Sequence, residues 1–419
     1  MDKFAIEGPS KIRGKVKISG SKNSSLPILA ATLLFNQPVK LKNLPKVKDI
    51  NTMISLLKSL GSKVILSRDR RTANIYNQKR LKTFASYSLV KTMRGSILVL
   101  GPLIAKYFKS KISLPGGCLI GARPINYHLD ALQKLGMNYI LQDGYILAKS
   151  KGKLKGTIIK FPKISVGATE NTIIAACLAK GTTTLKNCAI EPEIKDLTNF
   201  LNSAGAKITW KGRVCKIIGV TSLNKTDYSV MPDRIEAGTF CVAATVSRGN
   251  LDILNFDARI IKTELDLLKK FGAKIKVSKK KISIKGPKYL KSIKNIKTKE
   301  YPGVSTDMQS QIMVLMCKAN GKSSITENIF ENRFMHVAEL RRLGAKINVV
   351  KNKAFIQGNT KFVGAELMSS DLRASVSLVL AAIASKGKSL INRIYHLDRG
   401  YENIENKLRK IGVRIKRLR

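Results

Sequence analysis

The chain has 419 residues, of which 77 are Lys or Arg and 27 are Asp or Glu, giving a formal net charge of +50. Because 44% of the residues are hydrophobic and only 12 are Pro, the composition excludes fibrous and disordered classes. At this length we expect two or three domains. Apolar stretches fall short of the roughly 20 residues that a spanning helix needs, and residues 1–7 resemble no secretory signal. We therefore expect a soluble cytoplasmic protein without a membrane partner.

Cysteine and histidine usage argues against disulfides and metals. The six cysteines show no CxxC spacing, which favours free thiols in a reducing compartment. The three histidines share no ligand spacing with them, so we expect no metal site. The glycine-rich fingerprints of dinucleotide and P-loop sites are also missing, and we expect no cofactor.

The positive charge first suggests nucleic acid as a partner. However, Lys and Arg are spread over the whole chain, and aromatic residues make up only 6% of it. Stacking platforms for bases are therefore not apparent. Solvated basic faces explain the charge more simply, and an anionic small substrate fits either interpretation.

A short pattern of apolar residue, Gly, small residue, basic residue and apolar residue recurs six times. The pattern predicts an amphipathic helix that ends at a left-handed Gly and is followed by a strand. Its glycines are 67 to 75 residues apart and are Gly61, Gly136, Gly205, Gly272, Gly344 and Gly412. Each repeat is predicted to run strand, buried helix, strand, surface helix, strand. Six such units fill the chain and could close as two groups of three.

The second helix of each repeat is apolar on nearly every side, which predicts burial all round. Such helices are expected within 172–179, 239–246, 311–317 and 374–384. Polar residues gather where they begin, and N-capping explains Ser165, Thr306 and Asp371. Capping does not explain cations at these starts, because a cation there opposes the helix dipole by about 0.3–1 kcal/mol. An anion bound at the helix starts is the better explanation for Lys22, Arg94, Arg234 and Arg373.

One loop, residues 115–124, holds three Gly and two Pro around Cys118. Its composition favours mobility or an unusual backbone. Arg123 could lower the pKa of the Cys118 thiol, which would make this a reactive cysteine on a lid; a tolerated loop cysteine is the alternative. Cys177, Cys241 and Cys317 sit in apolar helices and are expected in the core. Arg333 and Arg399 lie beside acids, where structural ion pairs are an alternative to function.

Motifs along the whole chain are similar to those of the UDP-N-acetylglucosamine 1-carboxyvinyltransferases, a family of enolpyruvyl transferases. They lie at 19–23, 91–94, 114–118, 120–124, 165–169, 232–236, 306–309, 330–336, 370–375 and 395–402. The resemblance implies an α/β fold of two similar domains with three repeats each, an inside-out α/β barrel with buried helices and outer sheets. It implies domains at 22–231, which carries the cysteine lid of about 114–124, and at 1–21 joined to 232–419. The active site is then expected in the cleft between them.

The resemblance also implies the reaction. The 3-hydroxyl of UDP-N-acetylglucosamine attacks C2 of phosphoenolpyruvate, and phosphate leaves by addition and elimination in the first committed step of peptidoglycan synthesis. Asp307 matches the family's base, and Cys118 matches the acid, which also forms a covalent adduct with phosphoenolpyruvate. Lys22 and Arg399 match further catalytic residues. Both partners are small molecules, and we expect a monomer.

The resemblance assigns two sets of ligands. Phosphoenolpyruvate is expected to bind Lys22, Asn23, Arg123, Arg333, Arg373 and Arg399. UDP-N-acetylglucosamine is expected to bind Arg94, Arg123, Pro124, Ile125, Asn126, Tyr127, Lys163, Ile164, Ser165, Val166, Asp307 and Ile329. Two positions depart from the family pattern. Asn126 replaces an acid, which puts one uridine contact in doubt, and Ser305 replaces a Pro, which could loosen the turn before Asp307.

Three other functions are weighed against this one. A 3-phosphoshikimate enolpyruvyl transferase also uses Lys and Arg cations, but it lacks the lid cysteine. A basic nucleic-acid-binding protein would bind tightly and with strong salt dependence. Nucleic-acid binding would not explain six repeats with acids and cations at matched positions. A non-catalytic relative would not need Cys118 and Asp307.

Because Cys118 is retained rather than replaced by Asp, we predict sensitivity to the epoxide antibiotic fosfomycin. The epoxide should alkylate the thiolate and abolish phosphate release from phosphoenolpyruvate. The measurement compares residual activity after preincubation with and without the drug. Unchanged activity would contradict the assignment of Cys118.

Overall fold

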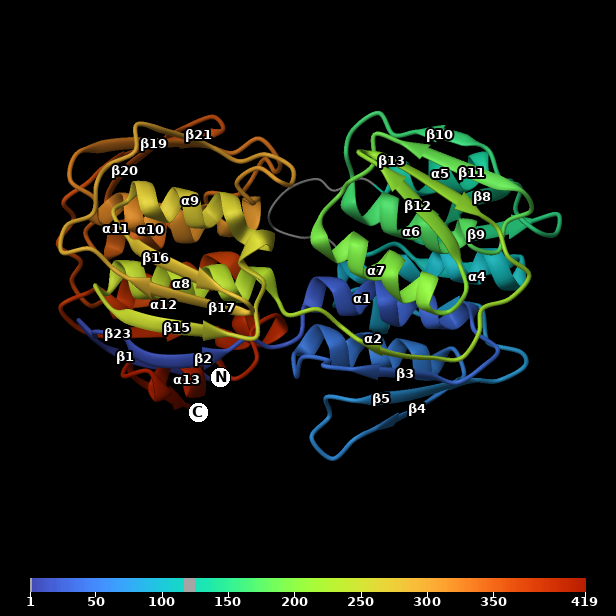
Figure 1. Cartoon of the computed structure of the whole chain (residues 1–419), viewed down its shortest axis with the longest axis horizontal. Helices are drawn as coiled ribbons and strands as arrows, with labels where there is room; N and C mark the ends of the chain where they lie inside the picture. Colours follow the sequence, from blue (N-terminus) through green and yellow to red (C-terminus); the bar gives the residue numbers. More distant parts are fainter. Residues whose placement is uncertain (1, 117–124) are drawn as a thin grey trace. The chain divides into compact units, whose positions relative to one another are not determined.

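The computed structural model describes residues 2–116 and 125–419, which form two compact units. One unit contains residues 20–116 and 125–231, and the other contains residues 2–19 and 232–419. Within the described residues, each unit has three four-stranded sheets on the outside and helices packed inside (Figure 1). The expected α/β fold, with three repeats per unit, is confirmed. Among the helices described, none has both the length and the apolar character required to cross a membrane.

The unit of residues 20–231 is built from three repeats in chain order. The first holds α1 (Lys22–Ala31), β3 (Val39–Lys42), α2 (Lys48–Ser59), β4 (Ser62–Leu66) and β5 (Ala73–Asn77). The second holds β6 (Phe84–Ala85), α3 (Tyr87–Val90), the 3-10 helix η2 (Arg94–Val99), α4 (Leu100–Tyr107), β7 (Lys109–Ser113), α5 (Asn126–Lys134), β8 (Met137–Gln142) and β9 (Tyr145–Ser150). The third holds β10 (Ile158–Lys160), α6 (Val166–Ala176), β11 (Thr182–Lys186), α7 (Pro192–Ser203), β12 (Lys207–Lys211) and β13 (Val214–Ile218), and β14 (Thr226–Ser229) follows it.

The other unit begins with β1 (Lys3–Gly8) and β2 (Arg13–Lys17) and resumes after residue 231. Its first repeat holds α8 (Arg234–Val246), β15 (Asn250–Leu254), α9 (Lys262–Lys270), β16 (Lys274–Ser278) and β17 (Lys281–Lys285). The next holds β18 (Asn295–Lys297), the 3-10 helix η4 (Thr306–Met308), α10 (Gln309–Lys318), β19 (Lys322–Thr326), α11 (His336–Arg342), β20 (Lys346–Val350) and β21 (Lys353–Gln357). The last holds β22 (Glu366–Met368), α12 (Leu372–Ile383), β23 (Gly387–Asn392), the 3-10 helix η5 (Ile394–Arg399), α13 (Ile404–Lys410) and β24 (Arg414–Leu418).

Each repeat contains a strand that the sequence analysis did not predict. The expected order ended with one strand after the surface helix, whereas the structure has a hairpin there. In the third repeat, β12 and β13 pair antiparallel, and Gly212 lies between them with a φ of 55°. The short strand β10 runs parallel to β11, so the sheet order is β10-β11-β13-β12. Burial alternates along β13 with the period of two that identifies a strand.

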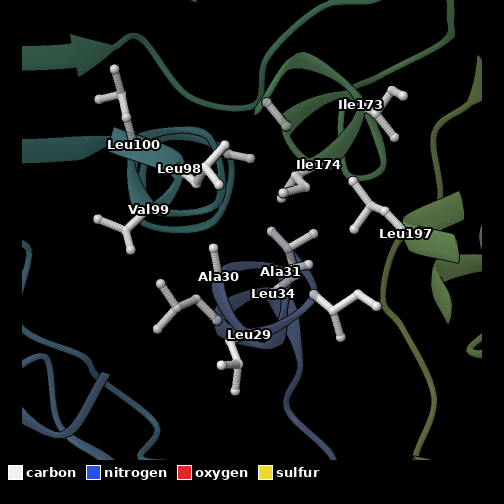
Figure 2. Close-up of a cluster of buried hydrophobic side chains, with 14 of the residues drawn as sticks. Leu29, Ala30, Ala31, Leu34, Leu98, Val99, Leu100, Ile173, Ile174 and Leu197 are labelled. Carbon is white, nitrogen blue, oxygen red and sulfur yellow. The ribbon is translucent and has the colours of Figure 1, made fainter. Parts of the chain in front are cut away.

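The buried helices are enclosed on all sides, as their apolar composition predicts. Every residue of α8 is buried, and so is every residue of α12 from Arg373 to Ile383. Figure 2 shows part of the core of the other unit, where Ala30 and Ala31 of α1 lie on the side that faces Leu98 of η2 and Ile174 of α6. Side chains from these helices fill the interior, so their termini are left as the places where polar groups can gather.

Two of these helices approach each other closely at a glycine. The amide of Gly101 in α4 donates to Asn171 Oδ1 at 2.8 Å, and Asn171 Nδ2 donates to the carbonyl of Ile97 at 3.2 Å. A Cβ on Gly101 would collide with the side-chain and main-chain oxygens of Asn171, which cannot retreat inside a buried helix. The contact between α4 and α6 therefore requires a residue without a side chain.

We predict that Gly101→Ala destabilises the protein by about 1–3 kcal/mol, because overpacking forces the two helices apart. The matched control is Gly95→Ala, where the atom nearest to a Cβ would be the Leu26 Cδ1 methyl at 3.2 Å and the next lies at 3.9 Å. That control should cost less than about 1 kcal/mol. The measurement is urea unfolding of both variants, and equal midpoints would contradict the packing argument.

Candidate active site

Asp307 lies at the centre of an ion-paired cluster in the unit of residues 2–19 and 232–419. Its Oδ1 accepts a hydrogen bond of 2.6 Å from Arg333 Nη2, and its Oδ2 accepts one of 2.8 Å from Arg373 Nη2. Asp307 belongs to η4 before α10, Arg333 precedes α11, and Arg373 lies in the first turn of α12. Three residues expected from the sequence are thus brought together from different elements.

The electrostatics of this cluster bear directly on the expected role of Asp307. Burial by itself raises the pKa of the Asp307 carboxyl, but Arg373 and Arg333, with a further contribution from Arg234, hold that pKa far below its ordinary range. The pKa of Arg373 is raised in turn by Asp307, against the effect of its own burial. At neutral pH Asp307 is therefore ionised, with each oxygen occupied by a guanidinium. A carboxylate bound in this way is a weak base.

The guanidinium of Arg373 is supported by Tyr401 and, through it, by Thr239, two residues whose roles the sequence analysis missed. Its Nη1 lies 3.3 Å from the hydroxyl of Tyr401, which lies 2.8 Å from Thr239 Oγ1 on α8. Tyr401 is buried, and burial raises the pKa of its hydroxyl to about 12, so it stays protonated. Tyr401 lies in the motif 395–402, but only the folded chain shows that it supports Arg373.

In the unit of residues 20–231, Lys22 is the first residue of α1, and Ser21 caps this helix by accepting from the Ser24 amide. Lys22 Nζ lies 3.2 Å from Asp49 Oδ2 in the first turn of α2. The side chains of Lys22 and Asp49 are only 14% and 5% exposed. Asp49 was missed by the sequence analysis, although an acid in the first turn of an amphipathic helix was a visible signal. Asn23 follows Lys22 and is partly buried.

Arg94 is the first residue of η2 and is partly buried. Burial and the positive charge of Arg94 together lower the pKa of His128 in α5 to about 3. His128 Nδ1 lies 3.2 Å from Asn171 Nδ2 inside the core. His128 is therefore a neutral packing residue at physiological pH and no candidate for proton transfer.

The residues expected to bind the sugar nucleotide lie at two helix starts of this unit. Ile125 and the exposed Asn126 begin α5, with Tyr127 following. Ser165 caps α6 by accepting from the Ala168 amide at 3.4 Å, while Lys163 and Val166 are exposed and Ile164 is partly buried. Cys118, Arg123 and Pro124 lie outside the described residues.

The last two expected residues belong to the other unit. Ile329 is partly buried in the loop after β19, and its amide donates to Glu327 Oε1 at 2.8 Å. Arg399 ends η5 and is partly buried. Its neighbour Asp398 pairs with Arg417 Nη2 at 2.7 Å, so this acid does serve in a structural ion pair.

One expectation about the turn before Asp307 is wrong. Ser305, not Thr306, is the N-cap, since Ser305 Oγ accepts from the Asp307 amide at 3.3 Å. Thr306 instead donates its hydroxyl to Glu327 Oε2 at 3.0 Å. The Ser305 amide also donates to Glu264 Oε1 at 3.3 Å, a bond that a Pro could not make. Serine at this position therefore gives the turn a hydrogen bond that a Pro would lack.

Cysteines within the described residues play a packing role. Cys177, Cys241 and Cys317 are buried as expected, and so are Cys188 and Cys215. Burial raises the pKa of Cys177 and of Cys317 to about 12, which removes them as nucleophiles. Among all the residues that the structure describes, no three or more His, Cys, Asp or Glu side chains form a group that could hold a metal ion.

A basic cavity of about 450 Å³ lies beside β2, β15 and β17. Its charged lining residues are Lys11, Arg13, Lys15, Arg248, Asp252 and Lys285. Asp252 pairs with Lys281 at 2.9 Å, so it is not available as a base. The cations continue the basic outer faces expected from the net charge, and the chemistry around Asp307 lies elsewhere.

Comparisons with known proteins show the family to which the chain belongs. Residues 6–408 match a family model described as EPSP synthase (3-phosphoshikimate 1-carboxyvinyltransferase). A UDP-N-acetylglucosamine 1-carboxyvinyltransferase of Pelagibacter ubique is 62% identical over all 419 residues and covers 100% of both chains. A protein of the same name from Endomicrobium trichonymphae is 47% identical over 417 residues, 99% of each chain.

Two solved structures share the fold at low sequence identity. The enolpyruvyl transferase NikO from Streptomyces tendae has a TM-score of 0.89 at 23% identity, covering 99% of this chain and 98% of that one. An EPSP synthase from Acinetobacter baumannii has a TM-score of 0.81 at 18% identity, with both chains fully covered. Fold, family model and full-length relatives agree, and the chain belongs to the enolpyruvyl transferase family, with the UDP-N-acetylglucosamine 1-carboxyvinyltransferases as its full-length relatives.

Proposed function

We propose that this enzyme transfers the enolpyruvyl group of phosphoenolpyruvate to the 3-hydroxyl of UDP-N-acetylglucosamine and releases phosphate, the first committed step of peptidoglycan synthesis. The observation that carries the proposal is the full-length identity of 62% to a relative whose name states this reaction. The site adds a carboxylate beside two buried guanidiniums, which suits a donor that carries a carboxylate and a phosphate.

The chemistry divides into addition and elimination. In the addition, Asp307 takes the proton of the 3-hydroxyl, the oxygen bonds to C2 of phosphoenolpyruvate, and Cys118 donates a proton to C3. In the elimination, C3 returns a proton, the double bond re-forms, and the bond from C2 to the phosphate oxygen breaks. Each step moves a proton to or from a positioned side chain while cations stabilise the negative charge.

Cations and helix starts supply the binding. Lys22, Arg123 and Arg399 bind phosphoenolpyruvate with help from Asn23 and Arg94, and Arg333 and Arg373 bind its carboxylate. The neighbouring Asp49 keeps Lys22 in place (Nζ to Oδ2 3.2 Å). The nucleotide contacts are residues 123–127 and 163–166, with Asp307 and Ile329. The enzyme works as a cytoplasmic monomer without a cofactor.

We predict that Asp307→Ala lowers phosphate release by about 10²-fold or more, the range that a general base contributes. Asp252→Ala is the control, since it removes an acid of the same type from the outer face of a sheet. The assay measures phosphate released from phosphoenolpyruvate in the presence of UDP-N-acetylglucosamine. Full activity of Asp307→Ala would contradict the assignment of Asp307 as the base. An inactive wild type would contradict the proposed function.

We predict that the acceptor is the sugar nucleotide and not the shikimate compound. Relatives along the whole chain share the former name at 46–62% identity, whereas the family model carries the latter name. Phosphate release should require UDP-N-acetylglucosamine, and 3-phosphoshikimate should give no release above the background without acceptor. Release with 3-phosphoshikimate alone would favour the other activity of this fold.

A further inference from the structure

The carboxylate of Asp307 covers two guanidiniums that are otherwise closed off from solvent. The side chains of Arg333 and Arg373 are only 4% and 7% exposed, whereas the side chain of Asp307 is 24% exposed. An anion that approaches from solvent therefore meets Asp307 before it can reach either arginine. The donor substrate needs these arginines for its own carboxylate, so the resting arrangement blocks the binding mode that the reaction requires.

The two arginines are held in place independently of Asp307. Arg373 is fixed by the Tyr401 hydroxyl at 3.3 Å, and Tyr401 is fixed by Thr239. The guanidinium of Arg333 lies 5.5 Å from the ring centroid of Phe330. Each cation therefore has a contact that does not depend on the carboxylate of Asp307.

The backbone of Asp307 is also fixed, but its side chain can rotate. The Asp307 amide donates to Ser305 Oγ at 3.3 Å, and the Asp307 carbonyl accepts from Gln311 Nε2 at 3.1 Å. The carboxylate itself accepts its hydrogen bonds from the two arginines. Rotation about the side-chain torsions therefore changes these two ion pairs without disturbing the start of α10.

We propose that the carboxylate of phosphoenolpyruvate replaces the carboxylate of Asp307 on Arg333 and Arg373, so that binding of the donor is what frees Asp307 to act as the base. The proposal rests on the proposed function and adds the order in which the site becomes active. One carboxylate exchanges for another, so neither buried guanidinium is left unpaired.

The physical reason for an exchange, rather than a simple opening, is the cost of an unpaired buried charge. Breaking a buried pair by removing one partner costs several kcal/mol, typically about 3–5. Asp307 therefore stays on the arginines until another carboxylate arrives. Released from them, the Asp307 carboxyl loses the interactions that hold its pKa low and gains two negative charges of the substrate nearby. Both changes make it a better proton acceptor.

The alternative is a structural role, in which Asp307 orients Arg333 and Arg373 and helps them to bind the donor. The two interpretations predict opposite effects of removing the Asp307 charge. If Asp307 competes with the donor carboxylate, Asp307→Asn should bind the donor more tightly. If Asp307 orients the arginines, the same variant should bind it more weakly or equally well.

The experiment is calorimetric titration of the full-length protein with 2-phospholactate, without acceptor. This probe carries the phosphate and carboxylate of the donor on saturated carbon, so it cannot undergo addition. We expect Asp307→Asn to bind it about 10- to 100-fold more tightly than the wild type, the range carried by hydrogen bonds to charged groups. Tighter binding in Asp307→Ala as well would exclude an effect of the introduced amide.

The matched control is Asp371→Asn. Asp371 caps α12 by accepting from the amides of Arg373 and Ala374, and Asn retains this cap. The variant removes a charge near Arg373 without touching its guanidinium pairing, so its affinity should change less than about threefold. Equal or weaker binding by Asp307→Asn, or binding by neither protein, overturns the exchange. This outcome is distinct from failure of the proposed function, which appears as a wild type without turnover.

Discussion

Burial of helices around their whole circumference is the constraint on which this structure depends. A helix such as α8, in which every residue is buried, can meet solvent or a substrate only near its two ends. The first amides of such a helix need acceptors, and the helix dipole attracts negative charge there. Among the expected site residues, Lys22, Asp307 and Arg373 lie at such starts.

The same constraint explains why acids and cations alternate at these positions. Asp233 caps α8 immediately before Arg234, and Asp371 caps α12 two residues before Arg373. The capping carboxylates satisfy the amides and offset the repulsion between the helix dipole and the neighbouring guanidinium. A cation that would be unfavourable alone at a helix start is thereby stabilised. Asp307 adds a further acid to the arrangement by pairing with Arg333 and Arg373.

Much of this organisation could be predicted from the sequence, because its signals are local. The recurring Gly after an amphipathic helix gave six repeats, and apolar composition on every side gave the buried helices. What was missed depends on contacts between distant segments. Asp49 is an ordinary first-turn acid until α1 brings Lys22 to it, and Tyr401 becomes a support for Arg373 only when Thr239 lies beside it. The hairpin strands were missed because their alternation spans only about five residues, and the Ser305 cap because two adjacent hydroxyls compete for one role.

The first two strands of the chain lie in sheets that are otherwise made from much later residues. Strand β2 pairs with β15, and β1 lies between β23 and β24, with Lys3 opposite Leu418. During synthesis on the ribosome, the unit of residues 20–231 can complete its three sheets before β23 and β24, the strands that pair with β1, have been made. Since β1 and β24 are neighbours, a circularly permuted gene that joins the two termini and opens the chain near residue 231 would encode each unit as one uninterrupted segment.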